Sequence, residues 1–226
     1  MRRDGPITGL LGGSFNPAHR AHRRISLFTL AALGLGEIWW LVSPGNPLKP
    51  KAGMAPLATR FRSAQAMAGN APIRVTAIER ELGTRYTADT LRALKRRFPR
   101  RRFVWVMGAD NLAQLHLWRD WRRLAREMPI AVVARPGYDR RALASPAMAW
   151  LRRHRLSAAG FRTRKVLNRG EWSAPALIEL RFDPDPLSAT SLRRADPHWA
   201  QRFGGRPLRD EVTRSLIHDT AKEPRA

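Results

Sequence analysis

The chain has 226 residues, of which 43% are hydrophobic, and its 42 Lys and Arg against 18 Asp and Glu give a formal net charge of +24. This length and apolar content suffice for a full core, which excludes a wholly disordered protein and indicates a single domain. The chain contains no cysteine, which excludes disulfides, thiolate metal sites and a cysteine nucleophile.

Charge and hydropathy limit the partners of the chain. A positive balance of this size favours polyanions, namely nucleotides, nucleic acid or an anionic membrane surface. The arginines are spread along the chain without a nucleic-acid reading motif, so nucleic acid is the less favoured partner. No apolar run reaches the roughly 18 residues of a membrane span, and the N-terminus lacks a signal-peptide pattern. We therefore expect a soluble, cytoplasmic protein without membrane contact, and a homo-oligomer is compatible with the sequence.

Hydrophobic periodicity and turn residues predict alternating strands and helices. In chain order, we expect a strand at 7–11, a helix at 17–33, a strand at 37–42, a helix at 56–70, a strand at 73–78, a helix at 87–98, a strand at 103–107, one helix or two short ones at 109–126, and strands at 130–134 and 177–182. Asn16 is expected to cap the first helix with Pro17 at its first position, and Thr87 to cap the third. Residues 138–176 indicate helix plus surface loop, a short helical extension begins near 187, and the segment 218–226 is expected to be frayed.

This alternation predicts βαβ units, and hence an α/β fold: a Rossmann-like, doubly wound parallel sheet with helices on both faces. Residues 1–226 are expected to form one domain. In such sheets ligands bind beyond the carboxyl ends of the strands. The loops after Leu11, Val42, Met107 and Ala134 are therefore expected to converge on the functional site.

The segment GGSFNPAHRAH, at 12–22, carries the strongest chemical signal. Gly12 and Gly13 let the backbone approach a ligand, and the following helix directs N–H groups to the same space, which indicates a phosphate site. His19 and His22 lie on one helix face, where protonated imidazoles can stabilise charge at a phosphorus centre. Two surface histidines or a pair of metal ligands are the alternatives. The segment is neither a GxGxxG fingerprint nor a Walker loop.

Several motifs in a fixed order resemble one family. GGSFNPAHRAH is similar to the GG(S/T)FDPxHxGH signature of the nucleotidyltransferase superfamily. The segments SPGNPLK, ELGTRYTADTL, MGADN, WRDW, ARPGY and SATSLR follow in an order and spacing that resemble the bacterial nicotinate-nucleotide adenylyltransferase family. The resemblance spans about 7–194. It implies adenylyl transfer from ATP to nicotinate mononucleotide, giving deamido-NAD and pyrophosphate in NAD biosynthesis. It also implies Mg²⁺ held mainly through the ATP phosphates, with no metal ligand from the protein.

Two alternatives stay open. An adenylyl- or cytidylyltransferase of the same superfamily would use another phosphate acceptor, such as phosphopantetheine. A basic nucleic-acid-binding protein built on the same sheet would use the positive charge of the chain. By resemblance, the segments TRYTADTL and WRDW favour a pyridine acceptor.

The resemblance also assigns roles to the matching positions. The residues expected at the ATP phosphates, and so in catalysis, are His19, His22, Lys49 and Arg193. The residues expected to bind the substrates are Gly12, Gly13, Ser14, Phe15, Tyr86, Thr87, Gly108, Asp110, Trp118, Arg135, Ser188 and Thr190. Thr87 would contact the nicotinate carboxylate and Trp118 would stack on the ring. Asp110 would accept from ribose hydroxyls or cap its helix, and both roles can hold at once.

Two positions depart from the family pattern. Asn16 stands where aspartate is usual, and Ala21 replaces the glycine of HxGH. Asn16 keeps an acceptor for a helix cap, so we expect little loss there. Ala21 places a methyl group next to the expected phosphate track, and we expect it to be tolerated because both histidines remain.

Overall fold

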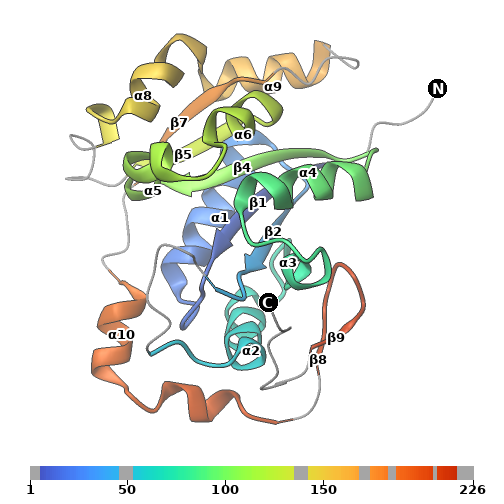
Figure 1. Cartoon of the computed structure of the whole chain (residues 1–226), viewed down its shortest axis with the longest axis vertical. Helices are drawn as coiled ribbons and strands as arrows, with labels where there is room; N and C mark the ends of the chain where they lie inside the picture. Colours follow the sequence, from blue (N-terminus) through green and yellow to red (C-terminus); the bar gives the residue numbers. More distant parts are fainter. Residues whose placement is uncertain are drawn as a thin grey trace.

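The sheet of the molecule is parallel throughout (Figure 1). The computed structural model describes residues 6–45, 53–134, 142–167, 174–182, 187–205 and 208–217. Within them, seven strands pair in the order β3-β2-β1-β4-β5-β7-β6. The strands of this sheet are β1 Ile7–Gly13, β2 Glu37–Val42, β3 Ile73–Thr76, β4 Arg102–Gly108, β5 Ile130–Ala134, β6 Arg155–Leu156 and β7 Leu177–Arg181. This order and direction confirm the predicted α/β fold.

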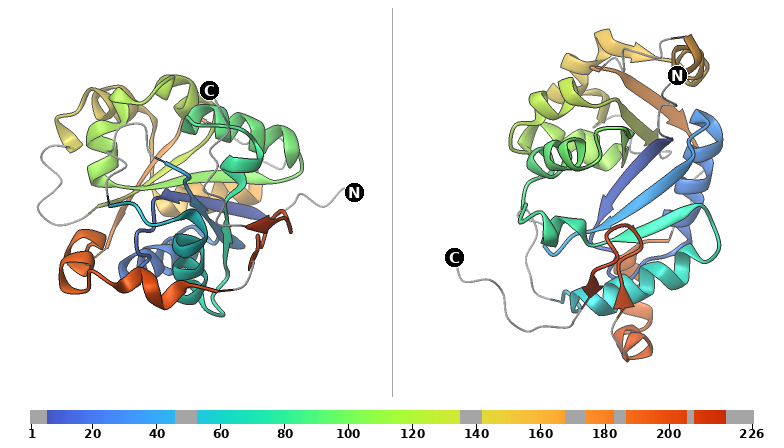
Figure 2. Two further views of the ribbon diagram at one scale, coloured as in Figure 1. Left: turned by 60° about the horizontal axis from the view of Figure 1, so that its bottom comes forward. Right: turned by 90° about the vertical axis from the view of Figure 1, so that its right-hand side faces the viewer.

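Helices cover both faces of the sheet, as the two views of Figure 2 show. The helices are α1 Arg20–Leu33, α2 Leu57–Ala68, α3 Ile78–Glu81, α4 Thr87–Arg97, α5 Ala109–Gln114, α6 Trp121–Glu127, α8 Pro146–Leu151, α9 Ala158–Leu167 and α10 Ala189–Ala195, with the 3₁₀ turns η1 Leu115–Leu117, η2 Arg152–His154 and η3 Trp199–Phe203. Side chains of α1, α2 and α9 pack in one buried cluster, and those of α4, α5, α6 and α8 pack in the other. The sheet is therefore the middle layer of three.

Strand β2, EIWWLV, illustrates why these sequences form central strands. Ile38, Trp40 and Val42 face the cluster that contains α1 and α2, whereas Trp39 and Leu41 face the cluster that contains α4. A strand that is apolar on both sides fits only a sheet that is covered on both faces. Burial of each such side chain contributes roughly 1.5–3 kcal/mol to the stability of the fold. The strand is therefore held firmly in the sheet.

Helix α1 begins later than the sequence predicts. It starts at Arg20, with His19 in extended backbone at the cap, instead of at Pro17. The Asn16–Pro17 peptide bond is cis, and the Asn16 side chain bonds to residues 53–55. The prediction that Asn16 caps this helix was wrong, because residues 14–17 belong to the preceding turn and not to the helix.

Other boundaries differ by smaller amounts. Tyr86 occupies the cap of α4 and Thr87 is its first helical residue, so the predicted Thr87 cap is also wrong. β3 ends at Thr76 because α3 begins two residues later. Of the two options for 109–126, a pair of short helices is confirmed as α5 and α6. The region 138–176 contains helices as predicted, and also the strand β6, which is too short to show periodicity.

The C-terminal segment contacts the outer edge of β3 through Asp210 and Glu211. It contains α10, as predicted, and a hairpin of β8 Leu208–Arg209 and β9 Leu216–Ile217 that was not predicted. Asp210 is fully buried, and its carboxylate accepts from the Thr76 hydroxyl at 2.9 Å and from the Ala77 N–H at 2.7 Å. The Glu211 carboxylate accepts from the Val75 N–H at 2.7 Å. The segment thus takes up hydrogen bonds that an edge strand would otherwise leave to solvent.

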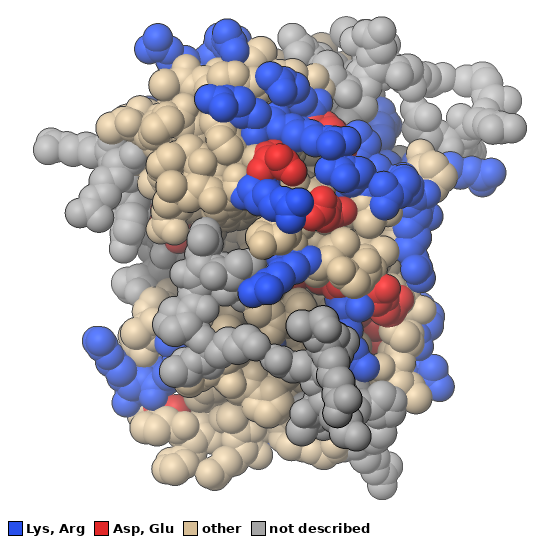
Figure 3. Space-filling view, in the orientation of Figure 1, with Lys and Arg blue, Asp and Glu red and all other residues tan. Residues whose placement is uncertain are grey.

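Positive side chains gather over α4 and α6 on the face seen in Figure 3. Several form exposed ion pairs, such as Arg123 with Glu127 at 3.1 Å and Arg97 with Glu81 at 3.5 Å. Pairs of this kind contribute at most about 1 kcal/mol each to the stability of the fold. We therefore interpret this surface as a solvated charged face. Among the described residues, no helix is long and apolar enough to cross a membrane.

Candidate active site

A pocket of about 300 Å³ opens at the carboxyl ends of β1 and β2. Its lining residues are Gly12, Gly13, Ser14, Ser43, Gly45, Glu79, Arg85, Tyr86, Thr87, Trp105, Asn111, Leu117, Trp118 and Arg119. The loops after β1, β2 and β4 therefore converge as predicted, and the loop after β5 lies outside the described residues. The pocket brings Gly12, Gly13 and Ser14 together with Tyr86, Thr87 and Trp118, which come from distant parts of the chain.

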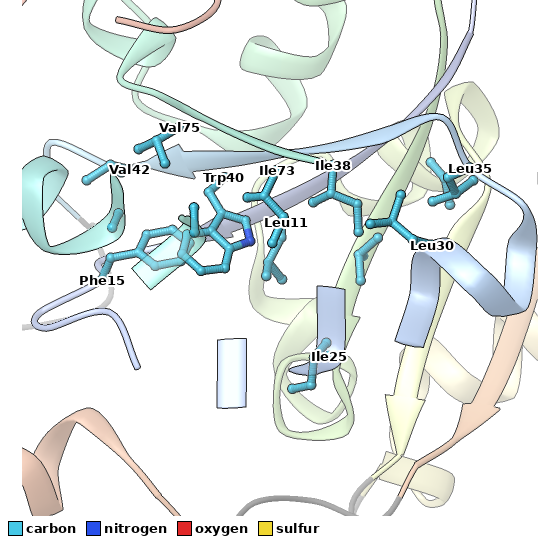
Figure 4. Packing of buried hydrophobic residues seen from close by; sticks show 14 of the residues in the cluster. Leu11, Phe15, Ile25, Leu30, Leu35, Ile38, Trp40, Val42, Ile73 and Val75 are labelled. Carbon is cyan, nitrogen blue, oxygen red and sulfur yellow. The ribbon is translucent and has the colours of Figure 1, made fainter. Parts of the chain in front are cut away.

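The glycine turn after β1 is fixed by aromatic packing beneath it. A Cβ atom on Gly12 would lie 2.7 Å from the Trp105 ring, so the indole occupies the space that a side chain would need. Phe15 has a left-handed backbone with φ of 47°, and its ring stacks on Trp40 at 5.1 Å between centroids (Figure 4). Because Phe15 is only 1% exposed, its side chain belongs to the core. Any contact that Phe15 makes with substrate comes through its backbone.

The two histidines lie together just beyond this turn. The ring centroids of His19 and His22 are 3.9 Å apart, and His19 is buried whereas His22 is half-buried. The His22 Nδ1 accepts from the His19 backbone N–H at 3.2 Å, so a neutral His22 ring carries its proton on Nε2. Within the part of the chain that the structure describes, neither imidazole lines the pocket. They lie at the start of α1, where helix N–H groups favour an anion, and the His22 ring lies 4.9 Å from the ring of Phe15, which follows the glycine turn.

Asn16 joins the turn to two other segments. Its Nδ2 donates to the Gly53 carbonyl at 2.9 Å, and its Oδ1 accepts from the Ala55 N–H at 3.1 Å. Its own carbonyl accepts from Arg193 Nη1 at 2.6 Å. An amide can donate and accept at once, and a carboxylate cannot. The departure from aspartate at this position therefore has a structural reason in this chain.

We expect Asn16→Asp to destabilise the fold by about 1 kcal/mol at neutral pH, because a buried acceptor would then face the Gly53 carbonyl without a donor. Urea denaturation of the wild-type chain and the variant measures this difference. Asn16→Ala is the matched variant, because it removes both bonds without adding a charge. An Asn16→Asp protein as stable as the wild type would contradict a stabilising role for the Asn16 bonds to Gly53 and Ala55.

Arg193 is held near the turn by α10. Ser188 caps this helix by accepting from the Ser191 N–H at 3.0 Å, as its predicted place at a helix start requires. Besides its bond to Asn16, Arg193 donates from Nη2 to the Thr190 hydroxyl at 3.4 Å. The structure therefore brings Arg193 to the turn, and Ser188 and Thr190 lie in the same α10 segment, which Figure 1 shows below α1.

The remaining predicted residues are not among the lining residues, and two of them lie outside the described residues. Gly108 caps α5 and Asp110 lies in its first turn, so the alternative in which Asp110 caps the helix is wrong. The Asp110 carboxylate folds back to where a Gly108 side chain would lie, which explains the glycine. Lys49 and Arg135 lie outside the described residues. Ala21 is buried at 2% exposure, so its methyl group packs inside the protein.

The far end of the pocket is aromatic and cationic. Trp118 lies edge-on to Trp105 with 6.3 Å between ring centroids. The Arg119 guanidinium lies 4.7 Å from the centre of the Tyr86 ring, an arrangement in which cation and ring attract each other. Arg85 and Arg119 line the pocket although the sequence analysis gave them no role. Both belong to the motif segments TRYTADTL and WRDW, and that position was the signal that could have identified them.

Glu79 is the acidic residue in the pocket lining, and it too was not predicted. Burial raises the pKa of its carboxyl from 4.5 to about 7, and hydrogen bonds with the side chains of Ser43 and Thr90 lower it only in part. The group therefore changes charge near neutral pH. A sequence cannot reveal this property, because it depends on the packing of α3 against the loop after β2.

The described residues contain no group of three His, Asp or Glu side chains that could hold a metal ion. The acidic groups near the site, Glu79 and Asp110, come from separate elements. Oxygen ligands from a bound triphosphate and water would suit Mg²⁺, which usually keeps several waters and takes few protein ligands.

Comparisons with known proteins show the family of the chain. The model of the cytidylyltransferase-like family matches residues 10–195. A protein of Erythrobacter litoralis (strain HTCC2594), named "Probable nicotinate-nucleotide adenylyltransferase", is 65% identical over 96% of this chain and 97% of its own length. A protein of the same name from Bradyrhizobium sp. (strain ORS 278) is 49% identical over 84% of this chain and 97% of its own length.

A solved structure extends the likeness to the fold. Plasmodium falciparum nicotinic acid mononucleotide adenylyltransferase, complexed with NaAD, superposes with a TM-score of 0.60 at 15% identity, over 84% of this chain and 83% of that one. At this identity the likeness concerns the fold alone. The motif order, the pocket and the two highly identical relatives carry the assignment, and the chain belongs to the nicotinate-nucleotide adenylyltransferases within the cytidylyltransferase-like family.

Proposed function

We propose that the chain transfers the adenylyl group of ATP to nicotinate mononucleotide at the pocket between the glycine turn and Trp118. The observation that carries this proposal is the pocket itself, which joins Gly12, Gly13 and Ser14 to Tyr86, Thr87 and Trp118 in about 300 Å³. One end offers the backbone of a phosphate-type turn, and the other offers aromatic and cationic groups for a ring that carries a carboxylate.

The reaction is a direct displacement. An oxygen of the acceptor's 5′-phosphate attacks the α-phosphorus of ATP, the bond to the bridging oxygen breaks, and pyrophosphate leaves. The acceptor phosphate is already anionic near neutral pH, so no general base is needed. His19, His22, Lys49 and Arg193 would stabilise the charge that develops on the phosphates, and the N-terminus of α1 would add to it. Mg²⁺, held by the phosphates and water, would neutralise part of the charge of the triphosphate.

At the acceptor end, Trp118 would stack on the pyridine ring while Thr87 and the arginines Arg85 and Arg119 meet its carboxylate. The α4 start at Thr87 favours an anion there, because the first N–H groups of a helix lack partners within the helix. Gly108, Asp110 and Arg135 would contact the nucleoside or phosphates of ATP, with Ser188 and Thr190 at its far phosphates.

The test is pyrophosphate release with ATP and Mg²⁺, which compares nicotinate mononucleotide, its amide and phosphopantetheine as acceptors. We expect turnover to be fastest with nicotinate mononucleotide. Faster release with phosphopantetheine would favour the alternative acceptor. No release from any acceptor, with oligonucleotide binding that falls steeply with salt, would favour the nucleic-acid alternative.

We expect Trp118→Ala to raise the KM for nicotinate mononucleotide by about 10-fold, because stacking on a base is worth roughly 1–3 kcal/mol. The KM for ATP should change little, since the glycine turn is untouched. Steady-state kinetics with each substrate varied in turn measures both constants. Trp150→Ala is the control, because Trp150 packs on Trp121, away from the pocket. Equal increases in the two KM values would contradict a stacking role.

A further inference from the structure

A buried arginine contacts the glycine turn that follows β1. Arg60, in α2, is 1% exposed. Its Nη1 donates to the Ser14 carbonyl and to the Ser43 carbonyl, each at 2.7 Å. Its Nε donates to the Ala55 carbonyl at 2.8 Å, and its Nη2 lies 3.5 Å from the Pro44 carbonyl. One guanidinium thus contacts three separate stretches of backbone.

Ser14 and Ser43 both line the pocket, one after β1 and the other after β2. The Ser43 N–H also donates to the Gly13 carbonyl at 3.0 Å, which continues the pairing of the two strands by one residue. Arg60 Nη1 then joins the segments that follow the two strands through the Ser14 and Ser43 carbonyls. The two loops at the phosphate end of the pocket are therefore linked by the Gly13–Ser43 backbone bond and by Arg60 Nη1.

The hydrogen-bond partners of Arg60 among the described residues are carbonyl oxygens, and no carboxylate is among them. Burial lowers its pKa to about 10, and the group stays protonated at neutral pH. A buried cation without an anionic partner is costly to the fold. Such a group fits a site in which a polyanion is bound a short distance away, across the turn.

We propose that Arg60 is a positioning residue for adenylyl transfer, which holds the turn at Ser14 and the loop at Ser43 at the spacing that the ATP phosphates require. The inference rests on the proposed function and deepens it. A lysine cannot replace the guanidinium, because an ammonium group is a single point of contact and cannot reach the Ala55 carbonyl and the Ser14–Ser43 pair together. Loss of Arg60 should therefore affect ATP more than the acceptor.

The experiment uses Arg60→Lys, Arg60→Met and a control on the same helix, Arg62→Met. Arg62 is the matched control because it donates to the Gly205 carbonyl at 2.8 Å on the exposed side of α2. We expect kcat/KM for ATP to fall on the order of 10-fold in both Arg60 variants. The KM for nicotinate mononucleotide should stay within about 2-fold, and Arg62→Met should match the wild type in both constants.

Ligand-induced shifts in Tm separate positioning from simple support of the fold. With Mg²⁺ present, adenosine 5′-(α,β-methylene)triphosphate should raise the Tm of Arg60→Lys less than that of the wild type, while nicotinate mononucleotide raises both equally. Proportional loss of both shifts, unchanged kinetics, or failure of both Arg60 variants to fold would overturn the proposal. If the wild-type chain itself releases no pyrophosphate, the proposed function fails, whereas the ATP-analogue shift still tests Arg60.

Discussion

Replacing His22 by alanine is expected to lower kcat by about 10² to 10³-fold, the usual cost of removing one donor that stabilises charge in the transition state. His22 is the half-buried member of the pair, and its Nδ1 is engaged with the His19 N–H at 3.2 Å. Its Nε2 is therefore the atom that would donate to a phosphate oxygen. Because the interaction strengthens as charge develops, the loss should fall on kcat more than on the KM for ATP.

The alanine variant also removes an acceptor at the start of α1, which costs about 1 kcal/mol of stability. His22→Asn separates the two effects, because an asparagine oxygen can still accept from the His19 N–H but offers no group in the place of Nε2. We expect His22→Asn to lose nearly as much turnover as His22→Ala while keeping more of its stability. Rapid-quench measurement of the single-turnover rate, with Tm for each variant and exposed His198→Ala as the control, makes the comparison. Near-normal turnover in His22→Asn would contradict a role for His22 in stabilising transition-state charge.

The central sheet could be predicted from the sequence because its strands are unambiguous. The strands at 37–42 and 130–134 are found with the predicted bounds, since both are apolar runs that are bounded by turn residues.

Prediction failed where local signals compete. Asn16 and Pro17 have good cap chemistry, but both lie in the turn, where Asn16 bonds to residues 53–55 and to Arg193 of α10. The strands β6, β8 and β9 have two residues each, which is too short for a hydrophobic period to show in the sequence.

The site, too, has residues that could be predicted from the sequence and residues that could not. The glycine turn, the histidine pair and Trp118 carry recognisable motifs, and the structure brings most of the motif residues to one end of the sheet. Arg60 and Glu79 could not be predicted, because an arginine in an amphipathic helix and a glutamate before a loop both suggest solvent exposure. Their importance follows from burial beside Ser43. Its carbonyl accepts from Arg60, and its side chain bonds with Glu79.

Ser43 thus contacts both a buried cation and a titratable acid. Arg60 is protonated throughout the neutral range, whereas Glu79 has a pKa of about 7. Below that pH the Glu79 carboxyl is neutral and does not repel an anionic acceptor. Above it, a carboxylate lines the same pocket as Arg85 and Arg119 and opposes binding of a phosphate and a nicotinate carboxylate. The acceptor pocket should therefore bind more weakly as pH rises through neutrality.

Glu79→Gln tests this property through the stability of the protein. Because the folded-state pKa of about 7 lies above the ordinary value of 4.5, the native chain holds the proton over a window in which the unfolded chain has lost it. The contribution of Glu79 to stability should therefore decrease as pH rises from about 4.5 to about 7. Glutamine keeps a neutral hydrogen-bonding group, so the variant should match the wild type near pH 5 and be more stable by about 2–3 kcal/mol at pH 8.

Urea denaturation of both proteins at pH 5, 6, 7 and 8 measures that difference, and the comparison at each pH cancels every other titrating group. The KM for nicotinate mononucleotide gives an independent readout over pH 6 to 8. We expect it to rise with pH in the wild type more steeply than in Glu79→Gln, because titration of the substrate phosphate is common to both proteins. A stability difference that is the same at pH 5 and pH 8 would show that Glu79 is ionised throughout. The pocket would then have to bind its anionic acceptor against a permanent negative charge.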